Sequence, residues 1–300
     1  MIFAVVAALI LQEGSSLLDQ GRRFLAEGNL KAAETLFREL ASRSPEDSRA
    51  SYYLGITLAR QDRTEEAVEA LENARRHATG PNPSLFYELG TAYSRIERWQ
   101  EAEDLLRQAT DLAPAEAAMR LQLGWVYYSK LEGEKARAEF ERVIATSPSA
   151  KAFLYLGMTE IGLGRNEPAV RALRQAIRLD AGLLDAHLAL GKVLTRAGRD
   201  EEAIPVLARA LEIDERSAEA HFGLGLIAVR RGDLESASRS FEVAIEAEPG
   251  HLQAWYNRAL VAERLGHGEE ARICWARVEE IRASGAEEPD ARRRMRARDR

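Results

Sequence analysis

Apolar positions and small residues recur along this chain with a period of 33 to 35 residues, and polar residues fill the positions between them. An alanine follows each small residue twelve positions later. A constant period of this length is typical of stacked helical hairpins, each too small to bury its own apolar face. The small residues are Gly21, Gly55, Gly90, Gly124, Gly157, Gly191, Gly225 and Ala259, and the alanines are Ala33, Ala67, Ala102, Ala136, Ala169, Ala203, Ala237 and Ala271.

Large apolar residues keep the same register. A leucine comes immediately before the glycine in six successive copies, from Leu54 to Leu224, and Gln20 and Arg258 replace it in the outer two. Because two helices approach closely only where side chains are small, we expect each glycine of a first helix to face the alanine of the second. Four residues after each alanine stands a bulky residue: Phe37, Leu71, Leu106, Phe140, Leu173, Leu207, Phe241 and Trp275.

Turn and capping residues separate the two helices of each copy. Five signals, one in each of five copies, predict that a second helix begins just after them: Gly28-Asn29, Thr64, Gly164-Arg165-Asn166, Gly198-Arg199-Asp200 and Gly232-Asp233. The two departures from the common period fall between helices, in Thr79 to Pro83 and after Pro148, where a change of length leaves the stack intact. No segment has the alternation of a strand.

The leucine-glycine pair, the later alanine, the bulky residue and a proline at Pro45, Pro114, Pro148 and Pro249 closely resemble the tetratricopeptide repeat. The resemblance covers residues 14–285. It implies an all-α solenoid of eight helix-turn-helix hairpins that forms a right-handed superhelix. The eight copies span about 14–47, 48–82, 83–116, 117–149, 150–183, 184–217, 218–251 and 252–285.

The charge of the chain is unevenly distributed. The net charge is −6, and residues 291–300 contain six arginines and one aspartate, which leaves −6 − 5 = −11 for the rest. The C-terminal tail 286–300 is therefore basic. We expect it to be solvated, because it is short and acids accompany it; a contact with nucleic acid is not favoured, since no aromatic residue is interleaved.

The N-terminal segment 1–13 is almost entirely apolar. Ile2 to Leu11 has the length of a signal-peptide core, and small residues at Gly14 to Ser16 would suit cleavage, although no basic residue precedes the core. We expect either such a signal or a helix packed on the first repeat. If residues 1–16 are a signal, the setting is a bacterial periplasm or envelope; otherwise it is the cytoplasm. The segment is too short to span a bilayer, so any membrane contact would run through it while uncleaved.

Candidate chemistry is sparse. Glycine patterns such as Gly223-x-Gly225-x-x-Ala228 lack the strand that a dinucleotide fingerprint needs. His187 and His221 occupy the same repeat position in neighbouring copies. Equivalent positions on stacked helices are too far apart to share a metal ion, so we expect both side chains to have a packing role. Cys274 is the only cysteine and is expected to be a buried small residue. We therefore predict no enzyme activity, no cofactor and no metal site.

A binding function is more consistent with the first helices. In proteins that this chain resembles, positions three before and one after the small residue line a concave groove, and they share one helix face. The second position often carries asparagine in the family but is apolar in five copies here. This difference argues against binding of a partner's C-terminal carboxylate and predicts an apolar groove. The candidate groove residues are Tyr52, Ile56, Tyr87, Trp125, Met158, Phe222, Leu226, Tyr256 and Leu260.

Arginines recur five residues after the small residue. They would either cap a helix C-terminus, which is the favoured interpretation, or pair with acids of a ligand. These arginines are Arg60, Arg95, Arg196, Arg230 and Arg264.

The sequence thus predicts a non-enzymatic scaffold that binds a segment of another protein in this groove. Two alternatives stay open. One is a structural protein that assembles with itself, and the other is a regulatory subunit of a separate enzyme. The sequence does not identify the partner.

Overall fold

A computed structural model describes residues 16–284 of the chain. The predicted N-terminal segment 1–13 and the basic tail 286–300 lie outside these residues. Residues 16–26 are helical and precede α2. The helices that follow are α2 (Leu30–Arg43), α3 (Ser48–Arg60), α4 (Thr64–Arg76), α5 (Pro83–Arg95), α6 (Trp99–Leu112), α7 (Ala117–Ser129), α8 (Gly133–Thr146), α9 (Ala150–Gly162), α10 (Asn166–Leu179), α11 (Leu184–Arg196), α12 (Asp200–Ile213), α13 (Ala218–Arg231), α14 (Leu234–Ala247), α15 (Leu252–Leu265) and α16 (Gly268–Ala283).

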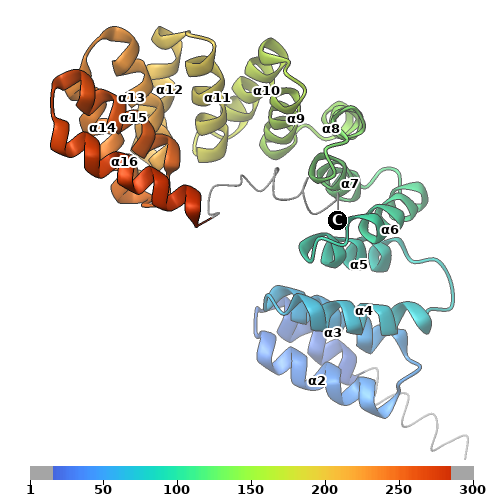
Figure 1. Cartoon of the computed structure of the whole chain (residues 1–300). Coiled ribbons are helices and arrows are strands. Elements are labelled where there is room, and N and C mark those ends of the chain that lie inside the picture. The colour runs from blue at the N-terminus through green and yellow to red at the C-terminus, as the bar shows by residue number, and fades with distance from the viewer. Residues whose placement is uncertain (1–15, 285–300) are drawn as a thin grey trace, which may run out of the picture. The chain divides into compact units, whose positions relative to one another are not determined.

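The fold is an all-α solenoid of helix-turn-helix hairpins, as predicted (Figure 1). The described part of the chain contains no strand. Odd-numbered helices are the first helices of the copies and even-numbered helices are the second, so that α3 pairs with α4 and α15 with α16. None of the described helices combines the length and the apolar character needed to cross a membrane.

The contacts divide the chain into two compact units, Met1–Glu139 and Phe140–Arg300. The division falls inside α8, in the fourth copy of the repeat. The repeat register continues through this position in the sequence, so the periodicity alone predicts no division there.

The recurring glycine has a closer neighbour than the expected alanine. A Cβ atom on Gly55 would lie 2.4 Å from Leu71 Cγ and 3.2 Å from the carbonyl oxygen of Ala67. A Cβ on Gly225 would lie 2.5 Å from the ring of Phe241. The glycine therefore faces the alanine through the alanine's carbonyl group, and its closest neighbour is the bulky side chain. The glycine makes room for the bulky residue four positions after the alanine, and the alanine contributes its carbonyl group.

One turn geometry connects the two helices in every copy. The residue seven positions after each small residue has a φ between 59° and 79°. In the next residue of the chain, a backbone N–H donates to the carbonyl oxygen five residues before it, as in Arg63 to Leu58 and Arg199 to Leu194. This is a Schellman-type helix end, which satisfies carbonyl groups that the helix leaves unpaired. The left-handed residues are Gly28, Asp62, Glu97, Leu131, Gly164, Gly198, Gly232 and Gly266.

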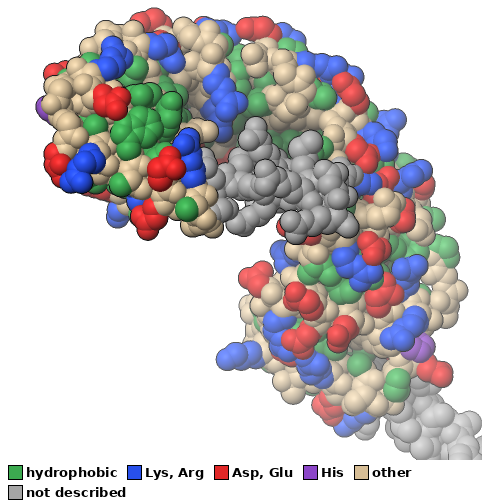
Figure 2. All heavy atoms as spheres, viewed as in Figure 1, with side chains coloured by type: hydrophobic (Ala, Val, Ile, Leu, Met, Phe, Trp, Pro, Cys, Tyr) green, Lys and Arg blue, Asp and Glu red, His purple; other side chains and the backbone are tan. Residues whose placement is uncertain are grey.

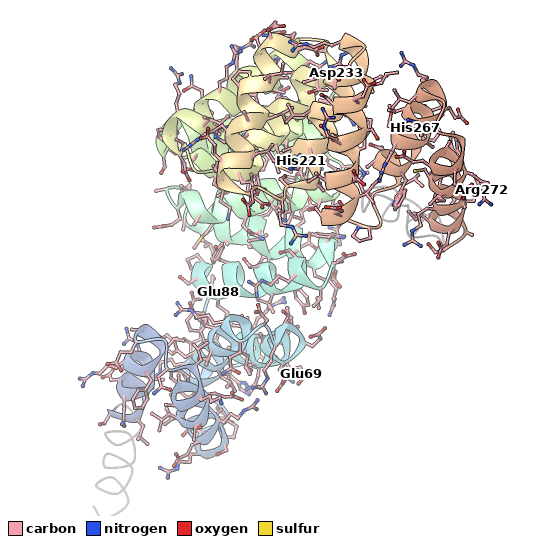
Figure 3. All side chains as sticks on the ribbon, turned by 90° about the vertical axis from the view of Figure 1, so that its left-hand side faces the viewer. Glu69, Glu88, His221, Asp233, His267 and Arg272 are labelled. Atoms are coloured by element: carbon pink, nitrogen blue, oxygen red, sulfur yellow. The ribbon has the colours of Figure 1, made fainter. Side chains whose placement is uncertain are left out.

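Polar side chains cap several of the helices. The side chains of Asn29 and Asp233 accept hydrogen bonds from the backbone N–H groups of Ala32 and Ser236. Asp233 lies at the start of α14 and His267 at the start of α16 (Figure 3). Thr64 is the first residue of α4 rather than its cap, because the left-handed turn at Asp62 places Arg63 at the capping position. The prediction for Thr64 was wrong by one residue, and so were those for Asn166 and Asp200, which are the first residues of α10 and α12.

Candidate functional site

The first helices form one side of each unit. In the first unit α3 contacts α5 and α5 contacts α7, and in the second unit α9 contacts α11 and α11 contacts α13. The second helices of neighbouring hairpins approach one another far less in the described residues. Within each unit the hairpins are therefore closest together on the side of the first helices. The first helices form the inner face of the unit. The predicted groove residues lie on these helices.

In the first unit this face combines aromatic and aliphatic side chains. Tyr52, Ile56, Tyr87 and Trp125 are all half-buried. The ring of Trp125 stacks on Tyr128 at 5.4 Å between centroids, which fixes its orientation on α7. Packing within the unit thus holds these side chains in place without covering them, which leaves apolar surface for a ligand.

Glu88 lies on α5, next to Tyr87 in the sequence (Figure 3). Burial raises the pKa of its carboxyl group, and the charges of Arg60 and Arg95 oppose that shift. Burial also raises the pKa of Tyr52 to about 12, and the negative charge of Glu88 adds to this effect. The groove of the first unit therefore contains a desolvated carboxyl group, which the sequence analysis did not single out. In most other copies the residue two positions before the small residue is uncharged. The repeat pattern therefore did not indicate a carboxyl group at Glu88.

In the second unit the predicted residues are half-buried on α9, α13 and α15, except for Tyr256, which is 38% exposed. The ring of Phe222 lies 5.8 Å from Phe241 and 4.8 Å from the ring of His251. Phe222 thus also packs within and between hairpins. A group of hydrophobic side chains is visible at the surface over α14 and α15 (Figure 2). The remaining predicted residues of this unit are Met158, Leu226 and Leu260.

The recurring arginines do not share one role. Arg60 Nη1 donates to the carbonyl oxygen of Leu25 at 3.1 Å, and Arg95 Nη1 donates to that of Ala59 at 3.0 Å. Each carbonyl lies in the last turn of the preceding first helix, so these arginines cap the helix of a neighbouring copy. Arg230 instead pairs with Asp200. Arg196 is exposed. The capping interpretation placed each arginine at the end of its own helix, and the contacts of Arg60 and Arg95 are instead with the preceding one.

The two histidines are held by backbone carbonyl groups. His187 Nε2 lies 3.1 Å from the carbonyl oxygen of Ala181, and His221 Nε2 lies 3.0 Å from that of Glu215. Trp255 Nε1 donates to Pro249 O at 3.0 Å from the same register position, again six residues away. The described residues contain no cluster of three metal-ligating side chains. The shared role of this position is to anchor the turn between copies.

Comparisons with known proteins agree with this architecture. A model of the tetratricopeptide repeat family matches residues 18–82, 87–151, 154–218, 201–237 and 222–287. Together these matches cover most of the chain. A search of curated proteins finds no match to the sequence.

Solved structures with this fold include a tetratricopeptide repeat protein from Parabacteroides merdae, which is 16% identical with a TM-score of 0.64 over 83% of this chain and 99% of that one. YrrB, described as a tetratricopeptide repeat protein with an unusual peptide-binding site, is 22% identical with a TM-score of 0.53 over 63% of this chain and 97% of its own. MamA is 25% identical with a TM-score of 0.51 over 56% and 92%.

The fold and the repeated hairpin define this protein as an α-solenoid repeat protein. The chain belongs to the tetratricopeptide repeat family. Proteins of this family generally act as non-enzymatic scaffolds for protein–protein interactions.

Proposed function

We propose that this protein binds a segment of a partner protein along the face of its first helices. The observation that supports the proposal is the row of half-buried apolar and aromatic side chains that runs over α3, α5 and α7 in the first unit and over α9, α13 and α15 in the second. Partly exposed apolar rows of this kind are usual at protein interfaces. The peptide-binding site described for YrrB is consistent with such a role.

The chemistry of the face suggests how a segment would be held. Apolar anchors such as Trp125 and Met158 would provide most of the affinity, because large, partly buried side chains dominate interface energetics. Arg60 and Arg95 are engaged with carbonyl groups, which leaves the exposed Arg196 as the more available guanidinium for an acidic group. The proposed ligand is therefore an extended or helical segment with apolar side chains at regular spacing.

The test compares two double variants in the capture of partners from cells that express the protein. In the groove variant, Trp125→Ala and Met158→Ala remove anchors from the first-helix face. In the control variant, Leu112→Ala and Leu179→Ala remove side chains that are 48% and 53% exposed at the ends of second helices. We expect the groove variant to lose its specific partners and the control to keep them, while circular dichroism shows that both remain helical.

Retention of every partner by the groove variant would contradict the proposal. The experiment also addresses self-assembly. If the main captured species is a second copy of this chain, and light scattering shows a mass that rises with concentration, the groove serves assembly rather than a separate partner.

A further inference from the structure

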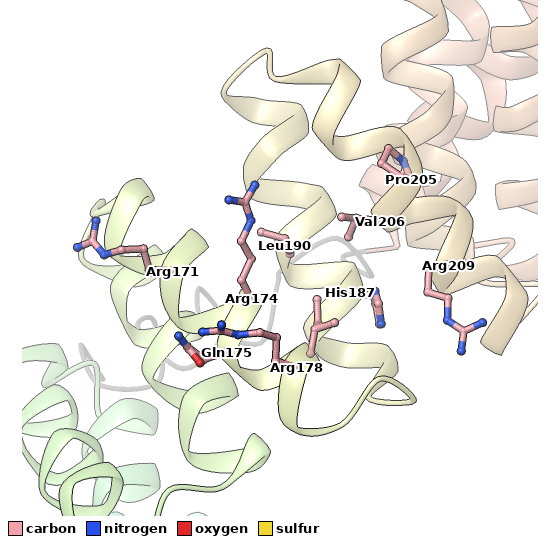
Figure 4. Close-up of a pocket in the computed structure, with 10 residues that line it drawn as sticks. Arg171, Arg174, Gln175, Arg178, His187, Leu190, Pro205, Val206 and Arg209 are labelled. Carbon is pink, nitrogen blue, oxygen red and sulfur yellow. The ribbon is translucent and has the colours of Figure 1, made fainter.

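The second unit contains a pocket of about 610 Å³ on the side of its second helices. The pocket lies between α10 and α12, with α11 beneath it (Figure 4). Arg171, Arg174 and Arg178 line it from α10, and Arg209 lines it from α12. Its apolar surface includes Leu190 and Val206, and this surface exceeds the polar surface.

The packing of the solenoid explains why a pocket forms here. Neighbouring second helices approach one another far less than the first helices, which leaves a gap between α10 and α12. In the fourth copy an ion pair joins the two helices at the equivalent positions, where Arg120 of α7 reaches Glu139 of α8 at 2.7 Å. The corresponding residues here are His187 of α11 and Val206 of α12, which cannot form such a pair. Arg174 of α10 reaches across the gap to Glu202 of α12.

The charge of this gap is distinctive within the sequence. The ten residues that line the pocket have equivalent positions in every other pair of neighbouring copies. Each of those pairs has at least one Asp or Glu at these positions. The pocket-lining positions of the fifth and sixth copies have none and carry four arginines, and a nearby acid, Glu202 of α12, pairs with Arg174. The pocket is therefore a basic site in a chain whose net charge is −6.

Two of the four arginines lack a carboxylate partner. Arg174 pairs with Glu202, and Arg209 pairs with Glu212. Arg171 and Arg178 are exposed and form no ion pair with any residue in the described range 16–284. Guanidinium groups bind carboxylates through paired hydrogen bonds, so these two are available to an anionic ligand.

His187 forms part of the wall of the pocket. Its side chain is buried, and Nε2 donates to the carbonyl oxygen of Ala181. Nδ1 is buried without a hydrogen-bond partner. The contribution of His187 to the pocket is therefore the wall that its ring forms on α11.

We propose that this pocket binds an acidic peptide segment of a partner protein, independently of the first-helix face. Carboxylates of the segment pair with Arg171 and Arg178, and an apolar side chain lies over Leu190 and Val206. A peptide suits the site better than a bilayer, because a flat lipid surface would reach the arginines at the rim and not the apolar floor between the helices. The pocket has the size of typical ligand sites.

The test measures fluorescence anisotropy of the full-length protein with a short fluorescein-labelled peptide that carries Glu-Glu-Leu-Glu between Gly-Ser spacers. The pocket variant Arg171→Gln with Arg178→Gln is compared with Arg23→Gln and Arg216→Gln, two exposed arginines outside the pocket and the groove with the same change of net charge. We expect the pocket variant to weaken binding about fivefold or more, and the control to change it less than about twofold.

Three results would overturn the proposal. They are equal binding of a peptide with Gln in place of Glu, equal loss of affinity in both arginine variants, and binding to phosphatidylserine vesicles that needs Arg171 and Arg178 while the peptide does not bind. The groove variant Trp125→Ala with Met158→Ala should bind the acidic peptide as the unaltered protein does. The experiment can therefore contradict the proposal for the pocket without contradicting the proposal for the groove, and the reverse.

Discussion

At the scale of single residues, close packing of glycine against a bulky side chain recurs through the stack. Gly55 and Leu71 make this contact in the first unit, where Leu71 is 1% exposed. The period of the sequence predicted which residues are small and which are bulky, because both requirements repeat. It did not predict which of them touch, since that depends on the crossing of the two helices.

Gly55→Ala should destabilise the first unit. The new Cβ would meet Leu71 Cγ at 2.4 Å, and overpacking of this kind costs about 1–3 kcal/mol, partly offset by the better helix propensity of alanine. Urea unfolding measures the loss. Gly80→Ala is the control, because a Cβ there has no neighbour within 4 Å. Equal stability of the Gly55 and Gly80 variants would show that the contact is not tight.

Glu88 has a predicted effect on the pH dependence of stability. Because burial raises the pKa of this carboxyl in the folded state above its ordinary value of 4.5, its protonation stabilises the fold below that value. This stabilisation is lost as the pH rises through the folded pKa. Glu88→Gln should therefore be more stable than the unaltered protein at about pH 7, and the difference should shrink towards about pH 4.

Urea unfolding at both pH values checks this, with the exposed Glu69→Gln as the control for loss of charge (Figure 3). A Glu88→Gln variant that is less stable at neutral pH would mean that attraction to Arg60 and Arg95 outweighs the cost of burial.

At the scale of the helical hairpin, the left-handed turn is the main feature that the sequence revealed only in part. Five copies have glycine at this position, and the turns at four of these glycines, all but Gly266, were predicted from the sequence. Asp62, Glu97 and Leu131 adopt the same conformation without glycine. The helix-end hydrogen bonds and the packing of both helices hold the turn there, so tertiary structure overrides the local preference.

Leu131→Gly should stabilise the protein. Leu131 has a φ of 62° and is 49% exposed, so its side chain contributes little packing. Relief of the left-handed strain, less the added entropy of glycine in the unfolded chain, should give about 0.5–1 kcal/mol. Thermal unfolding measures the gain. In the mirror experiment Gly198→Ala should lose about 1 kcal/mol, and a gain there would contradict the explanation.

The pocket between α10 and α12 shows where analysis of the sequence stopped. Its four arginines come from two second helices, whereas the groove predicted from the family resemblance lies on the first helices. The register contained a signal, because the fifth and sixth copies alone lack an acid at the positions that line this gap. That signal has meaning only once the structure shows which positions surround the gap.

At the scale of the whole molecule, the period of the sequence was sufficient to predict the solenoid. The number of copies, the two helices in each and the positions of their connections all follow from one repeated contact. The division of the chain at α8 and the choice of side chains left half-buried on the inner face do not repeat, and the sequence could not supply them.

Location in the cell is a separate proposal that rests on the sequence of residues 1–16. If this segment directs export, protein isolated from the envelope of a bacterial host should lack it, and intact-mass spectrometry would show a new N-terminus near Gly14 to Ser16. Protein that carries Met1 and stays in the soluble cytosol would contradict export.

The central claim is that the face of the first helices contacts the partner. Photo-cross-linking tests it directly, with benzoylphenylalanine placed at Ile56 or Leu226 on first helices and at Leu112 or Leu179 on second helices. We predict cross-links to the partner from Ile56 and Leu226 and none from Leu112 and Leu179. Cross-links only from the second-helix positions would contradict the claim.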